Sequence, residues 1–291
     1  MDFRELRILI RNNIDNDFFE ASNELEDILF NISTEETLPL ITEIGIIPED
    51  IAHDSTEEKL YTKTSDILFA KALKDLNLEV RVLRERSNCA DIIAQSKFHG
   101  YSLVGDAKAF RLSRTAKNAK DFKVESMVHW RGDCDYAVLT CPYFQYPKSN
   151  SQIYKSALDG NVALFSWEYL YILLSERIKE SQDSNLCTLW NQSAIIGRSI
   201  TVEDANKSFL RQQDANIQTF TEIPSDRFDS LFSRIKEGIA ARGNTEIQYF
   251  MNEISRIRNL DKDAAIQELI RSLKLDTKIE TIRNFINHLQ R

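Results

Sequence analysis

The middle of the chain alternates strand-length apolar runs with turns, and this alternation constrains the fold more than any other feature. Several runs are rich in β-branched residues, and turn signals such as His99-Gly100 and Asp159-Gly160 bound them. The runs span residues 80–83, 90–94, 101–108, 136–141 and 162–165. Helical patterns intervene around residues 120–130 and 167–180. We therefore expect an α/β fold in which a mixed sheet of about five strands is covered by helices.

The N-terminal part of the chain has the pattern of helices. Such patterns cover residues 3–11, 18–30 and 34–44. A Ser33-x-x-Glu36 capping box opens the third helix, and Gly45 follows its end. A second capping box, Ser55-x-x-Glu58, begins a long amphipathic helix that we expect to end near residue 76.

The last third of the chain is also helical in pattern. Thr201 and Asp204 are positioned to cap one helix, and Pro224 precedes another that is predicted to end before Gly243. Asp261 caps a run that ends at residue 273. We divide the chain into an N-terminal helical arm (1–54), an α/β core (55–180) and a C-terminal helical region (181–291), and expect them to pack as one globular unit.

Composition excludes several classes of protein. With 291 residues, of which 42% are hydrophobic and 28% charged, the chain can bury a full core. No apolar run is long enough to span a bilayer and no signal-peptide pattern opens the chain, so we expect a protein of the bacterial cytoplasm without membrane contact. The four cysteines are scattered, which predicts reduced thiols, and the four dispersed histidines argue against a zinc site.

Asp106 and Lys108 stand two residues apart at the end of the predicted strand over residues 101–108. Because side chains alternate sides along a strand, both leave the same face, about 6–7 Å apart along it. Asp91 opens the preceding strand, and residues 95–100 between the strands are few enough for a hairpin. We therefore expect the two strands to pair antiparallel, with Asp91 at the same end as Asp106 and Lys108.

Two carboxylates and a lysine in this arrangement favour phosphodiester hydrolysis. Neighbouring carboxylates resist joint ionisation unless a cation lies between them, and oxygen-only ligands favour Mg²⁺, with Mn²⁺ able to replace it. Such a metal polarises a phosphate oxygen and lowers the pKa of a bound water. Lys108 would orient or deprotonate that water, or offset charge in the transition state. The alternative, from these residues alone, is an ordinary ion pair at a solvated strand end.

A basic strip follows, in which a cation occurs at every third position from residue 108 to residue 123. Its members are Lys108, Arg111, Arg114, Lys117, Lys120 and Lys123. The strip contains one anion, Asp121, whereas the whole chain has a net charge of −8. An acidic body with one concentrated basic strip suits a groove for a polyanion.

The three-residue spacing predicts the course of the basic strip. In an α-helix, residues three positions apart differ by about 60° in their direction around the helix axis. Six cations at this spacing would wind around the helix and could not share one face. We expect a strand end, a loop and then a helix that curl along a duplex backbone. Asn118 can read adenine and Arg114 guanine in the major groove, although simple phosphate contacts are the alternative. The predicted DNA-binding residues are Arg111, Ser113, Arg114, Thr115, Lys117, Asn118, Lys120 and Lys123.

Three further acidic residues remain open. Asp121 is either an additional metal ligand or a local ion-pair partner of Lys117 or Lys120. Glu58 and Glu85 are candidates for a second layer of carboxylates, but Glu58 also completes its capping box.

These residues carry a resemblance to a known family. The segment from Gly105 to Lys123 closely resembles the HindIII family of type II restriction endonucleases. Three other motifs resemble it too: Ser55-Thr56-Glu57-Glu58-Lys59-Leu60, Phe144-Gln145-Tyr146-Pro147 and Phe165-Ser166-Trp167-Glu168. The similarity runs from about residue 40 to 175, and toward both ends only the helical character carries over.

The resemblance implies a PD-(D/E)xK nuclease fold for the core, with the active site at one end of the sheet. Asp91, Asp106 and Lys108 match its catalytic motif, although Ala90 stands where the motif usually has proline. It implies a symmetric homodimer on double-stranded DNA and the palindromic target AAGCTT, cut after the first A to leave 5′-phosphate ends and four-base overhangs. A companion DNA methyltransferase, which is not a stable subunit, is the implied functional partner.

Two other functions are compatible with the same residues. A repair or junction-resolving nuclease would keep the fold and select the shape of DNA, whereas a non-catalytic DNA-binding protein would use the acidic cluster only structurally. Discrete fragments from unmethylated plasmid favour restriction over the first alternative. An Asp106→Ala variant that behaves like the wild type favours the second.

Overall fold

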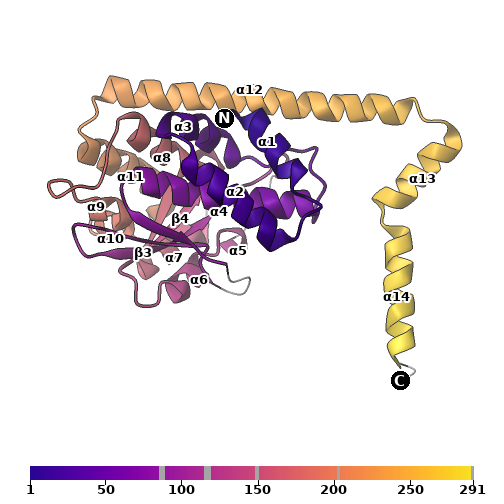
Figure 1. Cartoon of the computed structure of the whole chain (residues 1–291), viewed down its shortest axis with the longest axis horizontal. Helices are drawn as coiled ribbons and strands as arrows, with labels where there is room; N and C mark the ends of the chain where they lie inside the picture. Colours follow the sequence, from indigo (N-terminus) through magenta and orange to yellow (C-terminus); the bar gives the residue numbers. More distant parts are fainter. Residues whose placement is uncertain (85–88, 115–118, 148–150, 202–203, 290–291) are drawn as a thin grey trace. The chain divides into compact units, whose positions relative to one another are not determined.

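The computed structural model describes the whole chain except residues 85–88, 115–118, 148–150, 202–203 and 290–291 (Figure 1). The chain forms two compact units, Met1–Ala241 and Arg242–Arg291. Among the described residues, no helix is both long and apolar enough to cross a membrane.

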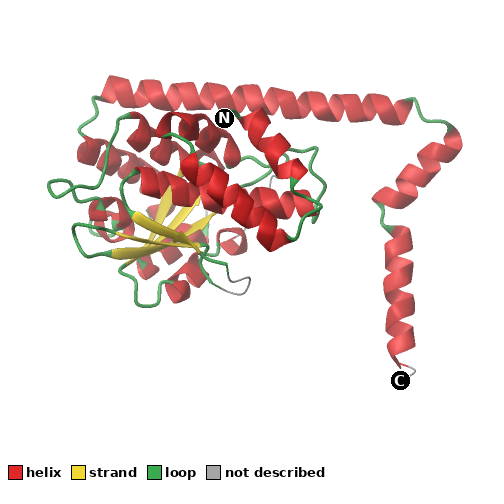
Figure 2. Cartoon of the chain, viewed as in Figure 1, coloured by secondary structure: helices red, strands yellow, loops and turns green. Residues whose placement is uncertain are grey.

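A five-stranded sheet lies at the centre of the first unit (Figure 2). The strands, side by side in chain order, are β1 (Glu79–Val82), β2 (Ile92–Gln95), β3 (Ser102–Ala107), β4 (Tyr136–Cys141) and β5 (Val162–Ser166). The pairs β1–β2 and β2–β3 are antiparallel, whereas β3–β4 and β4–β5 are parallel. The predicted α/β fold with a mixed sheet of about five strands is confirmed.

Helices cover both faces of this sheet (Figures 1 and 2). One face carries α1 (Phe3–Asn12), α2 (Phe18–Asn31), α3 (Thr34–Ile44), α4 (Thr56–Asp75) and α8 (Trp167–Ser175). The other carries α5 (Ala119–Phe122), α6 (Val124–Trp130) and α7 (Gln152–Gly160). Neighbouring strand residues alternate between the two cores: Leu103 packs in the first and Val104 in the second. The strands β3, β4 and β5 are therefore buried on both sides, whereas β1 at the edge of the sheet leaves one face exposed.

The N-terminal helices begin where the sequence predicts them. At α3 the capping box is complete, because Ser33 accepts from the amide of Glu36 and the Glu36 side chain accepts from the amide of Ser33. At α4 only half of the predicted box forms. Ser55 accepts from the Glu58 amide, but the Glu58 carboxylate accepts from the Asp54 amide and from Arg111. That interpretation of Glu58 is therefore wrong.

Helix α4 is the centre of the first core and not an amphipathic surface helix. Nearly every side chain from Leu60 to Leu73 is buried, including the polar Thr64, Ser65 and Asp66. The prediction of amphipathicity is wrong for this half of the helix, because the sheet and α2, α3 and α8 surround it. The N-terminal turns of α4 and Lys74 in its last turn face solvent.

Helix α4 packs very close to the strand that carries Asp106. A Cβ atom at Gly105 would lie 2.5 Å from Cε1 of Phe69 and 2.7 Å from Cγ1 of Ile92. Only glycine leaves room for this approach, and it brings the helix against β3 immediately beside the candidate site.

The remaining elements are the short helices η1 (Tyr143–Gln145), α9 (Cys187–Trp190) and α10 (Gln192–Ile196), followed by α11 (Ala205–Thr221), α12 (Ser225–Arg258), α13 (Lys262–Ser272) and α14 (Leu275–Leu289). Asp261 caps α13 by accepting from the amide of Ala264, as predicted. The predicted end of a helix before Gly243 is wrong, since α12 continues to Arg258. One glycine inside a helix costs only about 1 kcal/mol, which so long a helix can tolerate.

Candidate active site

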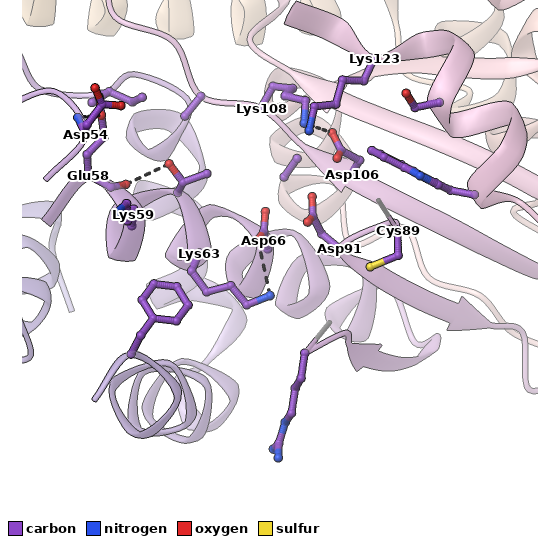
Figure 3. Close-up of a pocket in the computed structure, with 18 of the residues that line it drawn as sticks. Asp54, Glu58, Lys59, Lys63, Asp66, Cys89, Asp91, Asp106, Lys108 and Lys123 are labelled. Atoms are coloured by element: carbon purple, nitrogen blue, oxygen red, sulfur yellow. Dashed lines mark hydrogen bonds and ion pairs between the residues drawn. The ribbon is translucent and has the colours of Figure 1, made fainter. Parts of the chain in front are cut away.

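Asp91, Asp106 and Lys108 lie together at one end of the β2–β3 hairpin (Figure 3). Ile92 pairs with Gly105, so Asp91 and Asp106 are the next two residues to face each other across the strands. The Asp91 amide donates to the Gly105 carbonyl at 3.0 Å, which fixes this register. The Lys108 ammonium forms an ion pair with the Asp106 carboxylate. The hairpin thus brings the three predicted catalytic residues together.

The main chain around Lys108 is held from several sides. Its amide donates to the Thr140 carbonyl of β4 at 2.7 Å, and its carbonyl accepts from the Trp167 indole at 3.1 Å. The Trp167 ring in turn packs so close to Gly45 that a Cβ there would lie 2.6 Å from Cδ1 of the ring. The φ of Gly45 is −67°, which any residue can adopt, so the backbone conformation does not require glycine there. Glycine is required because a larger side chain would clash with the Trp167 ring.

Asp66, on helix α4, is a third acidic residue of the site. It is 5% exposed, and its Oδ2 lies 3.6 Å from the Lys63 ammonium. Its Oδ1 is buried without a hydrogen-bond partner among the described residues. Asp66, Asp91 and Asp106 point into the same space (Figure 3). Asp66 was not among the residues predicted from the sequence, although an acidic residue beside the apolar run Ile67–Ala70 was an available signal.

A cavity of about 970 Å³ opens over these carboxylates. Asp66, Asp91, Asp106 and Lys108 line it on one side. The exposed turns of α4 contribute Thr56, Lys59 and Lys63. Arg84, Lys123 and Trp130 line it as well. The cavity therefore has acids in its depth and several cations around them, and Lys59, Lys63 and Arg84 are cations that the predicted basic strip did not include.

Burial and the neighbouring carboxylates disfavour ionisation of Asp91 and Asp66. Burial, together with repulsion from Asp66 and Asp106, raises the pKa of Asp91 well above its ordinary value. Burial also raises the pKa of Asp66 to about 7, with Asp106 adding to the effect against the attraction of Lys63. Burial alone would lower the pKa of Lys108, but Asp106 and Asp91 outweigh it and raise that pKa, so the side chain is held as an ammonium.

This arrangement fits a divalent cation. Asp66 offers a buried carboxylate oxygen without a hydrogen-bond partner among the described residues. Burial and repulsion between the carboxylates raise the pKa of Asp66 and Asp91, and a bound cation would favour their ionised forms. In the part of the chain that the structure describes, no three Asp, Glu, His or Cys side chains form a ready-made metal cage. A cation held by Asp91 and Asp106 would therefore complete its coordination with water and substrate oxygens, as Mg²⁺ does at phosphate-processing sites.

Arg111, a predicted DNA-binding residue, lies in a buried network within the chain. It is 5% exposed, and its guanidinium donates to the carbonyls of Pro48 and Ile51, each at 2.7 Å, and to Glu58 at 2.6 Å. It thus ties the segment after β3 to the loop before α4 and to the first turn of α4. Burial favours the neutral form of Glu58, but the hydrogen bonds from Arg111 and from the Asp54 amide outweigh it and lower the Glu58 pKa.

The rest of the basic strip is divided between the surface and the cavity. Ser113 binds Glu49 through both its amide and its hydroxyl, at 2.9 Å each. Arg114 reaches Asp121 at 2.6 Å, so the carboxylate that was considered as a metal ligand has Arg114 as an ion-pair partner. Lys120 is exposed. Lys123 lines the cavity, with its ammonium 5.5 Å from the centre of the Trp130 ring. Thr115, Lys117, Asn118 and Glu85 lie outside the described residues.

Comparison with known proteins bears on what this site does. A family model described as HindIII restriction endonuclease matches residues 5–286. The type II restriction enzyme HindIII of Haemophilus influenzae (strain ATCC 51907 / DSM 11121 / KW20 / Rd) is 41% identical over 286 residues, which cover 98% of this chain and 95% of that enzyme. The chain belongs to the HindIII restriction endonuclease family. It is accordingly a type II restriction endonuclease, a site-specific deoxyribonuclease whose substrate is DNA.

Membership of the HindIII family extends beyond the resemblance seen in the sequence. The similarity reaches both helical ends of the chain and not only residues 40–175. Enzymes of this type generally depend on a divalent metal, which agrees with the partnerless Asp66 oxygen and the crowded carboxylates of the cavity.

Proposed function

We propose that the enzyme uses Mg²⁺, or Mn²⁺ in its place, to hydrolyse both strands of double-stranded DNA at a palindromic site. The resemblance of the segment from Gly105 to Lys123 to the HindIII family implies the site AAGCTT, cut after the first A to leave 5′-phosphate ends with four-base overhangs. The observation that carries this proposal is the pairing of Asp91 with Asp106 across β2 and β3, with Lys108 ion-paired at the floor of a cavity.

Each residue has a role that follows from its position. Asp91 and Asp106 would hold the cation, which polarises a phosphate oxygen and lowers the pKa of a water when it is bound. Lys108 is favoured as an ammonium, so it would orient the attacking water by hydrogen bonding and offset the charge that grows on the phosphate. This supports the positioning role of Lys108 over that of a base. Attack by water breaks the bond between phosphorus and O3′, so the phosphate remains on the 5′ end.

We further propose that the enzyme acts as a homodimer with a companion DNA methyltransferase. One active site cuts one strand, so a palindrome is cut symmetrically by two copies related by a two-fold axis. A methyltransferase that modifies the same site would protect the DNA of the cell, without being a stable subunit.

Digestion of mapped, unmethylated DNA tests the proposed reaction. We expect discrete fragments in Mg²⁺ and none in EDTA, and sequencing of the ends should give the same four-base 5′ overhang at each cut. Fragments with other ends would contradict the proposed target. Nicking restricted to branched or damaged DNA would instead favour a repair or junction-resolving role.

An Asp106→Asn variant tests the assignment of the catalytic residue. It should lose cleavage by at least about 1,000-fold while it still binds the duplex, because the charge at the candidate site falls but the cavity keeps its shape. Asp159→Asn makes the same change of charge at an exposed position of α7 and should cleave normally. Unchanged cleavage by Asp106→Asn would overturn the assignment.

A further inference from the structure

Residues 242–291, here called the C-terminal unit, concentrate the exposed apolar side chains of the protein. Fourteen large apolar side chains are exposed among the described residues, and eleven of them belong to this unit. Helix α13 buries none of its residues. Apolar surface of this extent is unusual on a monomeric soluble protein and marks an interaction site.

On α12 and α14 the exposed apolar side chains line up along one face of the helix, and each such row is here called an apolar seam. On α12, Ile247, Phe250, Ile254 and Ile257 follow one another at steps of three, four and three residues. On α14, Leu275, Ile279 and Ile282 follow at steps of four and three. Alternating steps of three and four place the side chains on one face of a helix, which is the pattern of helices that pair with other helices.

Helices α13 and α14 of the C-terminal unit are too short to be stable without a surface to pack against. Helix α13 has 11 residues and α14 has 15, and all side chains of α14 that the structure describes, from Leu275 to Arg283, are exposed. Isolated helices of about 12–15 residues are marginal in water, because most helical stability in proteins comes from packing of an apolar face. A surface that covers the seams therefore accounts for the presence of these helices.

We propose that the apolar seams of the C-terminal unit form the surface that a second copy of this chain covers in the dimer. This inference rests on the homodimer of the proposed function and names its contact surface. The eleven side chains are each 40–59% exposed. They offer on the order of 1,000 Å² of surface, which meets the roughly 800 Å² per partner of a standard interface.

Charge favours a second copy over DNA as the occupant. The C-terminal unit carries nine Lys and Arg against seven Asp and Glu, so two copies that meet here bring together almost no net charge. Isoleucine, leucine and phenylalanine side chains offer nothing to a phosphate backbone. A self-complementary apolar surface is what a two-fold contact needs.

Sedimentation equilibrium of the full-length chain without DNA tests the surface directly. The wild type should be a dimer. Ile279→Lys/Ile282→Lys and Ile254→Lys/Ile257→Lys should each raise the dimer dissociation constant by at least about 100-fold, since every substitution occurs twice in a symmetric contact. Thr277→Lys/Thr281→Lys adds the same charge at exposed positions on the opposite face of α14 and should leave the constant unchanged.

The results of these measurements distinguish a failure of the proposed dimer surface from a failure of the proposed nuclease function. Asp106→Asn should remain a dimer although it does not cut DNA, whereas the seam variants should cut with a rate that rises with the square of protein concentration. A wild type that cuts both strands as a stable monomer would overturn the surface while leaving the nuclease assignment intact. Seam variants that remain dimers and only melt at a lower temperature would also overturn it, because the seams would then be covered within one chain.

Discussion

At the scale of the residue, the site is a set of acids held at a cost to stability. Asp66, Asp91 and Asp106 face a common cavity, and burial with mutual repulsion raises the pKa of the first two. A protein gains nothing in stability from three buried carboxylates that repel one another. Their presence is accounted for if a bound cation and a polyanionic substrate complete the charge balance.

The pKa of Asp66 leads to a prediction for the metal-free enzyme. A carboxyl whose pKa is 3.8 when unfolded and about 7 when folded binds its proton more tightly in the folded state. Its effect is therefore a loss of stability that begins as pH rises above about 4 and is complete above about 7. An Asp66→Asn variant in EDTA should gain free energy of unfolding relative to the wild type across this window, to roughly 2–4 kcal/mol at pH 8.

Urea unfolding at pH 4.5, 6 and 8 measures this gain. Glu168 also has a pKa raised to about 7 by burial, but it is present in both proteins and cancels in the difference. Asp159→Asn is the matched control and should show no dependence of the difference on pH. A difference between wild type and Asp66→Asn that stays constant from pH 4.5 to 8 would contradict the argument.

The three site residues named from the sequence and the one it did not single out differ in how they reach the site. Asp91, Asp106 and Lys108 come from two strands joined by a short turn, so alternation of side chains was enough to bring them together. Asp66 arrives from a helix that is distant along the chain, and only packing at Gly105 brings it near. Arg111 was predicted from its charge to bind DNA, and in this structure its guanidinium donates to Glu58 and to two backbone carbonyls, a network that sequence could not reveal.

At the scale of the element, the relation between α4 and β3 decides the geometry of the site. Phe69 of α4 lies one turn from Asp66 and contacts the strand at Gly105, the neighbour of Asp106. The sequence predicted both elements but gave no means to predict their separation. It likewise placed the end of a helix before Gly243, because the weak local preference of glycine was read without the stability of the surrounding helix.

Gly105→Ala should therefore damage the site without touching any of its polar atoms. A methyl group at 2.5 Å from Phe69 and 2.7 Å from Ile92 forces both side chains to move, at a cost of about 1–3 kcal/mol in the free energy of unfolding. Cleavage should fall together with stability, since Asp66 and Asp106 lie on the two elements that separate.

A second substitution and a control isolate the contact. Phe69→Leu in the Gly105→Ala background should restore part of the cleavage rate, because the smaller side chain makes room for the methyl group. Gly238→Ala lies in α12 with nothing within 4 Å of the added Cβ, so it should be neutral or slightly stabilising. Normal cleavage and stability of Gly105→Ala alone would show that the close approach is not a constraint.

At the scale of the whole molecule, charge is arranged so that an acidic protein can approach DNA. The net charge is −8, yet cations from several elements surround the cavity: Lys59 and Lys63 from α4, Arg84 after β1, and Lys123 before α6. The sequence predicted that positive charge would be concentrated after β3. It did not predict that helix α4 supplies part of it, because residues far apart in sequence gain a common surface only through the fold.

The salt dependence of DNA affinity tests whether these cations around the cavity bind DNA. Lys59→Ala and Lys123→Ala each remove one cation that lines the cavity, so each should weaken binding to all duplex sequences and reduce the slope of log affinity against log salt concentration by about 1. The Asp106→Asn background allows binding to be measured in Mg²⁺ without cleavage. Lys155→Ala removes an exposed cation of α7 that does not line the cavity and should leave the slope unchanged. Equal salt slopes for all three variants would mean that DNA binds another surface of the protein. A reduced slope for Lys123→Ala alone would mean that the basic strip, and not helix α4, contacts the DNA backbone.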